Sequence, residues 1–406
     1  MGGGPSSLPK VEAPEVAAEQ KATLRTPPNA VVIGLTGGIA SGKSTVCQVL
    51  EQQGGAIVLN ADHFGHEAYK PGTACQAELV AHFGEQIINK EDGTVDRKTL
   101  GGLVFADPKE REALNAIVWP AIRDLLRQRV FEITNENPAD RTAKLIVIEA
   151  AILIEANWMD LIDELWVVTT NVDTAKTRLM ARNSMSEEDA MKRINSQISN
   201  EERRAVAHVD VPNEGDESAL KDAVVAELEK LHARYSRLSA FEMVDVVDKE
   251  DQVQTTAKRA VVRAFNLISR CSYVVLVQQT SGKIFVQRRS DLKDSGPGLL
   301  DPAPGGVLGA GESYLLNAQR EMAEEMGLPG LSLEHVSALW YEDGNERSWG
   351  TIFCAKVDAD VSSLTLQPSE VSSVELMSPE EILTADPSQF LPGGLAAFKL
   401  WSSKQQ

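Results

Sequence analysis

The sequence predicts an α/β domain with a doubly wound parallel sheet, followed by an α+β domain. Strand-like apolar runs alternate with helical patterns through the first half of the chain, as in doubly wound folds. Beyond about residue 240, strand-like segments separated by glycine and serine turns surround a single clear helix. A chain of 406 residues is long for one domain and accommodates two. We therefore expect domains at 30–238 and 240–406.

The first domain begins with the segment 30–35, a continuous apolar run of the kind that forms buried parallel strands. Three more strands are predicted at 56–59, 144–148 and 164–169. Helical patterns lie between and after them, at 44–53, 101–105, 108–134, 172–182, 186–204 and 217–239. In the second domain we expect strands at 243–247, 273–277, 283–287 and 348–356, and one helix at 314–326.

Residues 1–29 are rich in Gly, Pro, Ala and Glu and lack hydrophobic periodicity, so we expect a disordered tail. The acidic residues of this tail argue against a mitochondrial presequence, and the tail has no apolar segment typical of a secretion signal. The first six residues fit the loose N-myristoylation pattern at Gly2. A plain flexible terminus is the favoured interpretation of the same residues, because the pattern is so short.

The formal net charge of -19 comes from 59 acidic and 40 basic residues. Such a surface repels phosphate backbones, which argues against nucleic-acid binding. The longest apolar stretch, 145–154, contains Glu149 and is too short to span a bilayer. The four cysteines show no paired spacing, which suits a reducing compartment. We therefore expect a soluble, cytoplasmic protein, and nothing in the sequence indicates its oligomeric state.

A phosphate-binding loop is predicted directly after the first strand. Residues 37–44 match the pattern G-x-x-x-x-G-K-[ST], with a strand before them and a helix after them. Lys43 is expected to reach the β- and γ-phosphates of ATP, and the Ser44 hydroxyl to ligate Mg²⁺. A glycine-rich turn without a ligand is the alternative. The predicted nucleotide-binding residues are Gly37, Gly38, Ile39, Ala40, Ser41, Gly42, Lys43, Ser44 and Thr45.

Two further features point to phosphoryl transfer. Asp62 follows the second strand, where a carboxylate can orient an acceptor hydroxyl and take its proton, although a helix-capping aspartate is the alternative. Arg178 and Arg182 are spaced i and i+4 on a predicted helix and share one face. Such a pair can close over the transferring phosphoryl group and stabilise its charge, although a solvated basic face is the alternative.

These residues resemble those of the dephospho-CoA kinases. The matching segments are 36–45, 62–72, 92–97, 104–105, 119–120, 149–158, Arg178 with Arg182, and Gln197 with Arg203. Trp119-Pro120 and Ala150-Ala151 differ from the bacterial form of that family and are similar to the kinase domain of the animal-type bifunctional CoA synthase. The resemblance implies phosphorylation of the ribose 3′-hydroxyl of dephospho-CoA, with Asp62 as general base and Arg182, with Arg178, as lid cation. Asn60 stands where the family often has a second aspartate, so the site has one carboxylate fewer.

The second domain carries its own motif at 306–328. Gly306, Glu312 and the run from Arg320 to Leu328 fit the Nudix pattern G-x5-E-x7-R-E-U-x-E-E-x-G-U, in which U is aliphatic. Glu312 is expected to pair with Arg320 and brace the loop onto the helix. A solvated, charged helix face is the alternative.

The predicted metal site lies on that helix. Glu321, Glu324 and Glu325 are spaced i, i+3 and i+4, so their carboxylates share one face. Three like charges repel unless a divalent cation neutralises them, and oxygen ligands suit Mg²⁺ or Mn²⁺. The backbone carbonyl of Gly306 is expected to add a ligand, and Glu370 is a candidate for a further ligand or base.

The resemblance to Nudix proteins implies metal-assisted hydrolysis of a diphosphate linked to another moiety. Further matching segments, including 286–290, 297–298 and 347–350, are similar to the isopentenyl-diphosphate-isomerase-like branch. Isomerase activity is not expected, because the stretch in which isomerases carry a catalytic cysteine reads Leu-Asp-Pro-Ala-Pro at 300–304.

Three interpretations remain open at this point. The chain is a fusion of two active enzymes, an active kinase with a Nudix domain that only senses a nucleotide metabolite, or a P-loop kinase for another small acceptor. The partners expected under the first are dephospho-CoA, ATP and a diphosphate metabolite.

Overall fold

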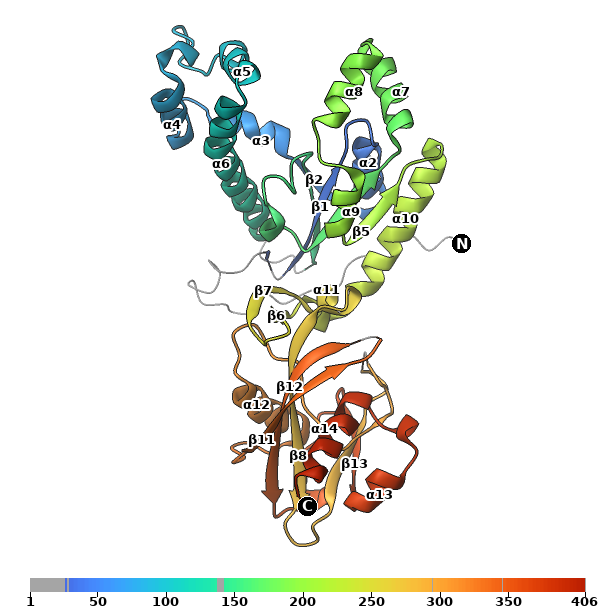
Figure 1. Cartoon of the computed structure of the whole chain (residues 1–406). Coiled ribbons are helices and arrows are strands. Elements are labelled where there is room, and N and C mark those ends of the chain that lie inside the picture. The colour runs from blue at the N-terminus through green and yellow to red at the C-terminus, as the bar shows by residue number, and fades with distance from the viewer. Residues whose placement is uncertain (1–25, 28, 137–141, 294, 345, 406) are drawn as a thin grey trace. The chain divides into compact units, whose positions relative to one another are not determined.

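A computed structural model of the chain describes residues 26, 27, 29–136, 142–293, 295–344 and 346–405. The predicted tail lies outside these residues except for 26, 27 and 29, and the Gly2 myristoylation pattern lies wholly outside them. Thr26 is buried and donates its hydroxyl to Asp163 Oδ1 at 2.6 Å, so ordered structure begins before residue 30. The chain divides into two compact units, Met1–Phe241 and Glu242–Gln406 (Figure 1).

Unit 1 is built on a five-stranded parallel sheet with the order β2-β3-β1-β4-β5. The strands are β1 (Ala30–Gly37), β2 (Ile57–Asn60), β3 (Lys144–Glu149), β4 (Glu164–Thr169) and β5 (Val209–Pro212). The predicted doubly wound α/β fold is confirmed. The edge strand β5 was not predicted, because its four residues alternate between buried and exposed and end in a proline.

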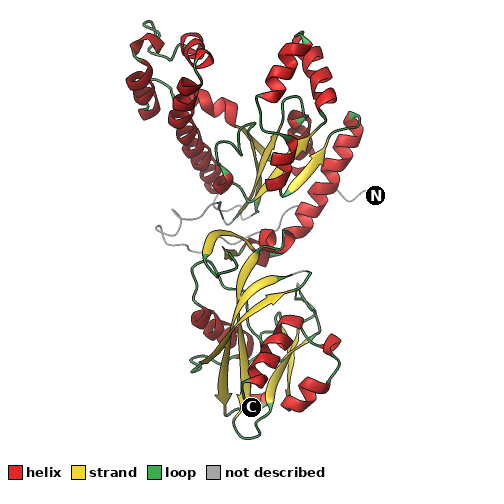
Figure 2. Ribbon diagram, in the orientation of Figure 1, coloured by secondary structure: helices red, strands yellow, loops and turns green. Residues whose placement is uncertain are grey.

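Helices cover both faces of this sheet (Figure 2). One face packs against α3 (Ala61–Ala68), α4 (Ala74–Phe83), α5 (Arg97–Ala106) and α6 (Pro108–Asn135) in a single hydrophobic core. The other face carries α2 (Lys43–Gly54) and α10 (Glu217–Arg234). A Cβ atom on Gly54 would lie 3.1 Å from Leu228 of α10 and 3.2 Å from Leu145 of β3, so these three elements are in close contact.

Three short helices follow β4, namely α7 (Val172–Asn183), α8 (Glu187–Asn195) and α9 (Asn200–Val206). The prediction of one helix at 186–204 is wrong. Ser199 accepts from the backbone N–H of Glu202, whose carboxylate in turn accepts from the N–H of Ser199. This capping box starts a new helix and turns the chain.

Unit 2 contains a six-stranded mixed sheet and a separate two-stranded sheet. Its strands are β6 (Met243–Val247), β7 (Val253–Lys258), β8 (Ile268–Gln278), β9 (Ile284–Arg289), β10 (Leu300–Asp301), β11 (Glu334–Glu342), β12 (Arg347–Val357) and β13 (Val371–Met377). Its helices are α11 (Arg259–Ala264), α12 (Tyr314–Met326), α13 (Pro379–Thr384) and α14 (Pro392–Ser403). The larger sheet is antiparallel except for the parallel pair β8–β12.

The larger sheet of unit 2 separates two hydrophobic cores. Val274 and Leu276 of β8 pack with Met322 of α12, whereas Tyr273 and Val275 belong to the core formed with α14. This alternation is the period-two pattern of a strand that is buried on both faces. The helix predicted at 314–326 has the predicted bounds. The remaining helices of unit 2, and the strands beyond the four that were predicted, were not anticipated.

A buried carboxyl group in unit 2 leads to a pH-dependent stability. Burial raises the pKa of Asp301 to about 6, against a partly compensating effect of Arg289. Because the pKa is raised, the folded state favours the protonated carboxyl of Asp301. The contribution of this group to the free energy of unfolding is therefore fully present below pH 3.8 and is lost as the pH rises through about 6.

We therefore expect Asp301→Asn to become more favourable relative to wild type by up to about 3 kcal/mol between pH 4 and pH 7, since each pKa unit corresponds to about 1.4 kcal/mol. Denaturant unfolding of both proteins across this range measures the difference. Asp358→Asn, at an exposed position of the same unit, controls for the loss of one negative charge. A pH-independent difference for Asp301→Asn would contradict the assignment.

Candidate active sites

The loop predicted to bind phosphate connects β1 to α2. Gly42 has φ of 105°, which is unfavourable for a residue with a side chain, and a Cβ atom there would lie 2.3 Å from Asn213 Nδ2. Lys43 begins α2, and its ammonium group donates to the carbonyls of Gly37 at 2.8 Å and Gly38 at 3.2 Å. The loop is thus folded around the Lys43 ammonium group, with Ser44 exposed in the first turn of the helix.

The charged groups around Lys43 come from several elements. Burial lowers the pKa of Lys43, Glu149 and Asp62 act in the opposite direction, and Arg203 adds to the lowering. The carboxylates lie at the carboxyl ends of β3 and β2, which flank one another in the sheet. The charges of Asp62, Glu149 and Arg203 therefore act on Lys43, and of these residues only Lys43 and Asp62 are predicted as catalytic residues.

The start of α3 explains how Asp62 is presented. Asn60 is the N-cap residue, and its side-chain oxygen accepts from the backbone N–H of Asp62 at 2.9 Å. The side-chain amide of Asn60 donates to Glu149 Oε2 at 2.7 Å. Asp62 itself is exposed in the first turn. The capping role that was the alternative for Asp62 belongs to Asn60, which leaves the Asp62 carboxylate available to an acceptor.

The predicted pair of arginines is divided in the structure. Arg178 Nη2 donates to Asn213 Oδ1 at 3.3 Å, and Asn213 in turn donates to the carbonyl of Ser41 at 2.7 Å. Arg178 therefore reaches the phosphate-binding loop through one side chain. Arg182 is exposed and donates to Asn183 at 3.1 Å, so this structure does not bring it to the loop.

Arg203 approaches the loop more closely than either predicted arginine. It is 2% exposed, and a Cβ atom on Gly38 would lie 3.6 Å from its Nη1 atom. Gln197 accepts from the backbone N–H of Ile39 at 2.8 Å. Four buried donor groups at this site have no hydrogen-bond partner among the described residues: Ser41 Oγ, Arg178 Nη1, Arg203 Nε and Arg203 Nη2. Such donors, clustered at a glycine loop, suit a polyphosphate.

The glutamate helix of unit 2 is α12. Glu312 binds Arg320 through both carboxylate oxygens, at 3.0 and 3.3 Å, and also accepts from Asn317 and from the backbone N–H of Gly309. This is the brace that the sequence predicts. Burial opposes the ionisation of Glu312, but these hydrogen bonds outweigh it and lower its pKa.

The carboxylates of the predicted metal site differ in their surroundings. Glu321 lies against the loop, since a Cβ atom on Gly306 would come within 2.4 Å of its Oε1 atom. Burial raises the pKa of the Glu321 carboxyl to about 7, and Glu325 adds to the shift. Glu325 is 2% exposed, whereas Glu324 is exposed. The carbonyl of Gly306 accepts from Ser272 N–H at 2.9 Å and keeps a second lone pair.

Two basic side chains lie among these glutamates. The sequence predicts that the three carboxylates repel one another unless a cation is bound, but in the structure Arg320 and Lys293 already offset part of their charge. Arg320 Nη1 lies 3.0 Å from both Glu321 Oε1 and Glu324 Oε2. The Lys293 ammonium group pairs with Glu370 and lies 3.3 Å from Glu325. Within the described ranges, no group of three His, Cys, Asp or Glu side chains is placed to hold a metal ion. The donors are nevertheless carboxylate oxygens grouped around one helix face, which suits a divalent cation.

Comparison with known proteins identifies both units. Residues 31–219 match the family model described as dephospho-CoA kinase, and residues 269–393 match the NUDIX domain. The chain is 45% identical over 184 residues to the dephospho-CoA kinase of Geobacter sulfurreducens, a match that spans 45% of this chain and 90% of the relative. The chain belongs to the dephospho-CoA kinase family. Unit 2 carries a NUDIX domain, and both are families of enzymes.

A second relative of this dephospho-CoA kinase family member gives the same result. The dephospho-CoA kinase of Thermobifida fusca is 42% identical over 208 residues, covering 50% of this chain and 98% of the relative. Among solved structures, TT1252 from Thermus thermophilus is 32% identical, with a TM-score of 0.41, over 50% of this chain and 98% of that chain. None of the helices in the described ranges combines the length and apolar composition that a membrane crossing requires.

The site residues that were missed in this family member lie far along the chain from the loop that they contact. Arg203 and Gln197 appear among the segments that resemble dephospho-CoA kinases, but they were assigned no role. Their local sequence has the composition of an ordinary charged helix, so the sequence shows no sign that they reach the loop. Lys293 likewise belongs to a segment that resembles the isopentenyl-diphosphate-isomerase-like branch of Nudix proteins, but that resemblance assigns it no contact with Glu325 or Glu370.

The Glu312 brace can be tested separately from metal binding. Glu312→Gln is expected to lower the unfolding free energy of unit 2 by about 1–3 kcal/mol, because the charge-assisted bonds to Arg320, Gly309 and Asn317 are weakened. Calorimetry of the purified chain measures the shift. A divalent cation should still stabilise this variant. Glu334→Gln, at an exposed position on β11, is the matched control, and an equal effect in both variants would contradict the brace.

Proposed function

We propose that unit 1 transfers the γ-phosphoryl group of ATP to the ribose 3′-hydroxyl of dephospho-CoA, and that unit 2 hydrolyses a diphosphate-linked metabolite. The observation that carries the first part is the placement of Asp62. It is presented by the Asn60 cap, exposed to an acceptor, and close enough to Lys43 to influence its pKa. These observations support Asp62 as the group that receives the acceptor hydroxyl.

The residues of unit 1 divide the work of this transfer. Backbone N–H groups of the loop and the Lys43 ammonium group bind the β- and γ-phosphates, and the Ser44 hydroxyl would hold Mg²⁺, which would neutralise phosphate charge. Asp62 orients the 3′-hydroxyl and accepts its proton as the oxygen attacks phosphorus. Arg203 and Arg178 stabilise the charge on the phosphoryl oxygens. Arg182 reaches that charge only if α7 and α8 move, as a lid does.

In unit 2 the glutamates at 321, 324 and 325, with the Gly306 carbonyl, are the groups that would hold Mg²⁺ or Mn²⁺, and the cation would supply charge neutralisation at the phosphoryl oxygens. Glu370, which pairs with Lys293, is the candidate for a further ligand or for the group that accepts a proton from the attacking water. Lys293 holds Glu325 and Glu370 near one another through its ammonium group. In this proposal the carboxylates on α12 form the cation site, and Glu370 is either a further ligand or the base.

The two activities should separate cleanly by mutation. In the full chain with ATP and Mg²⁺, Lys43→Ala is expected to remove most phosphorylation of dephospho-CoA, because the ammonium group that the loop encloses is lost. Hydrolysis of diphosphate metabolites by the same variant should be unchanged. Product analysis by chromatography measures both reactions. Turnover of nucleosides without turnover of dephospho-CoA would contradict the proposed acceptor.

A further inference from the structure

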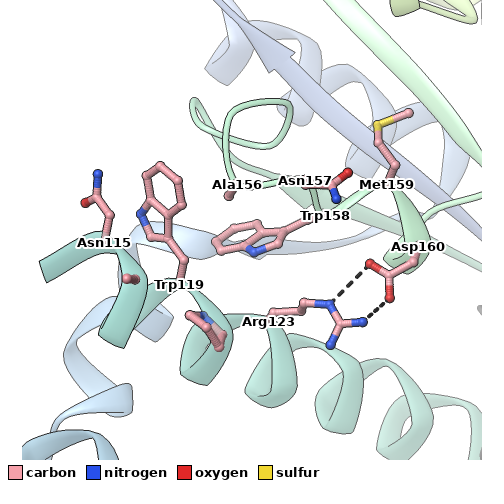
Figure 3. Close-up of a pocket in the computed structure, with 10 residues that line it drawn as sticks. Asn115, Trp119, Arg123, Ala156, Asn157, Trp158, Met159 and Asp160 are labelled. Atoms are coloured by element: carbon pink, nitrogen blue, oxygen red, sulfur yellow. Dashed lines mark hydrogen bonds and ion pairs between the residues drawn. The ribbon is translucent and has the colours of Figure 1, made fainter. Parts of the chain in front are cut away.

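The ion pairs of the two units differ in the balance of their charges. In unit 1, Arg123 and Arg127 both donate to Asp160, at 3.2 and 2.5 Å. Figure 3 shows Arg123 directed at Asp160 at one end of a pocket of about 630 Å³ beside α6. In unit 2 the balance is reversed, because the single ammonium group of Lys293 pairs with both Glu325 and Glu370. Lys293 is therefore one cation held by two carboxylates.

Lys293 connects two elements that carry candidate cation ligands. Glu325 lies on α12, and Glu370 directly precedes β13. The ammonium group of Lys293 lies 3.3 Å from Glu325 Oε1 and pairs with Glu370 Oε2. The side chain of Lys293 is 16% exposed and that of Glu325 is 3% exposed, so little water reaches this pair. In such a shielded place, a charge of either sign is costly without a partner.

A buried amide beside Glu325 offers a further oxygen acceptor. Gln287 of β9 is fully buried, and its Nε2 atom donates to Glu325 Oε2 at 3.1 Å. The Oε1 atom of the same amide is also buried and has no hydrogen-bond partner among the described residues. The surroundings of Glu325 therefore hold more oxygen acceptors than the Lys293 ammonium group satisfies, which suits a divalent cation.

The backbone on both sides of Lys293 is anchored, whereas its ammonium group is held by the two glutamates. Ser290 donates its backbone N–H to the carbonyl of Glu370 at 2.9 Å, and Lys293 donates its own to the carbonyl of Ser290 at 3.1 Å. Beyond Lys293, the guanidinium of Arg289 donates to the carbonyl of Ser295 at 3.0 and 2.8 Å. A lysine carries its charge on a flexible four-carbon stem. The ammonium group can therefore leave the carboxylates while the backbone stays in place.

This arrangement explains why the carboxylates do not form a ready cation site. In the part of the chain that the structure describes, no three His, Cys, Asp or Glu side chains are placed to hold a metal ion. A divalent cation needs several oxygen ligands around one point. Glu325 and Glu370 instead gather around the Lys293 ammonium group. Lys293 must therefore release both carboxylates before they can serve as ligands.

We propose that Lys293 takes the place of the divalent cation when none is bound and binds the diphosphate of the substrate when the cation is present, an assignment that rests on the proposed function of unit 2. An ammonium group that has given up two carboxylates beside a divalent cation is repelled by it and lacks a counter-charge. A diphosphate supplies this charge, and lysine binds phosphate as a compact point charge with three donors. The same side chain thus weakens cation binding without substrate and strengthens diphosphate binding with the cation.

The first test measures the cation alone, by electron paramagnetic resonance of Mn²⁺ titrated into the full chain. The site in unit 2 is identified as the Mn²⁺ binding that is lost in Glu324→Gln. Lys293→Met is expected to lower the Kd of this site by about tenfold or more, since one charge-assisted hydrogen bond corresponds to about this factor. Lys293→Arg keeps the competing charge and should not tighten binding. Lys399→Met, at an exposed position on α14, is the matched control and should leave the Kd unchanged.

The second test measures the diphosphate by equilibrium dialysis with methylenediphosphonate, which cannot be hydrolysed, at saturating Mg²⁺. All chains also carry Lys43→Ala, so that the loop of unit 1 contributes little binding. Lys293→Met is expected to bind the probe about tenfold more weakly, and Lys399→Met should bind it as the parent does. A damaged fold would weaken both ligands. Tighter Mn²⁺ together with weaker diphosphonate therefore identifies the exchange, whereas a purely structural lysine would change the melting temperature and neither constant.

The outcomes distinguish failure of this proposal from failure of the proposed function. If wild type and Lys293→Met bind Mn²⁺ equally, the proposal is overturned, while diphosphate hydrolysis by wild type would still support the proposed function. If diphosphonate binding is unchanged in Lys293→Met, the role of Lys293 toward the substrate is overturned. If Mn²⁺ binds to the variant but not to wild type, Lys293 is the stand-in cation and the proposed hydrolysis fails. If neither protein binds Mn²⁺ in unit 2, both fail.

Discussion

Asp62→Asn is expected to slow phosphoryl transfer by about a hundredfold or more while ATP binding stays close to the wild-type level, the typical scale for loss of a general base. The expectation rests on the hydrogen bonds at the start of α3. Asn60 caps the helix, and Asp62 contributes only its backbone N–H to that cap. An asparagine at 62 therefore keeps the local fold and removes the group that accepts the proton. Single-turnover measurement of the chemical step gives the effect directly.

The control for Asp62→Asn is Asn60→Ala, which removes both the cap and the donor to Glu149. This variant should lose about 1 kcal/mol of stability, as is typical for an N-cap residue, and a smaller share of the chemical step. Near-normal kcat in Asp62→Asn would show that another group accepts the proton. Glu149 would then be the next residue to test, because it is the nearest carboxylate that the structure places beside Asn60.

Glu324→Gln is expected to abolish diphosphate hydrolysis and to reduce the stabilisation of unit 2 by divalent cations. A cation that binds only the folded state raises its stability by about 2.7 kcal/mol at a concentration one hundred times the Kd. Glu324 is exposed, and within the described residues its side chain contacts only Arg320. Its replacement therefore costs little stability in the absence of metal. The loss therefore reports on the cation and not on the fold.

Calorimetry of wild type, Glu324→Gln and Glu312→Gln with and without Mg²⁺ separates the roles of the two glutamates. Wild type and Glu312→Gln should both gain melting temperature with Mg²⁺, and Glu324→Gln should gain much less. The pairing of Arg320 and Lys293 with the glutamates means that the metal-free wild type should be stable by itself. If all three proteins melt alike with and without Mg²⁺, unit 2 is a binding module without metal chemistry.

The sequence predicted those features that depend on residues close together in the chain. The glycine loop between a strand and a helix, and the spacing of Glu321, Glu324 and Glu325 on α12, follow from local geometry alone. The pairing of Asn60 with Glu149, 89 residues away, depends on the neighbouring ends of β2 and β3. No local pattern shows which strands will be neighbours, so such contacts could not be predicted.

The same distinction applies to the arginines. Arg178 and Arg182 form a visible i, i+4 pair, yet only Arg178 is linked to the loop, through Asn213, whereas Arg182 is exposed near the end of α7. Arg203 sits in α9, whose capping box at Ser199 turns the helix toward the P-loop. A charged helix in isolation shows neither which face it buries nor what lies opposite. The packing of α9 decides that Arg203, and not Arg182, is buried.

The buried donors of Ser41, Arg178 and Arg203 tie the folding of unit 1 to its ligand. Each buried donor without a partner costs about 1–3 kcal/mol, and here four of them gather within one site. A polyphosphate that accepts hydrogen bonds from these donors removes that cost. Its binding therefore raises the free energy of unfolding of the whole unit. The nucleotide thereby acts as a structural component of the kinase unit, so that loading with substrate and resistance to unfolding rise and fall together.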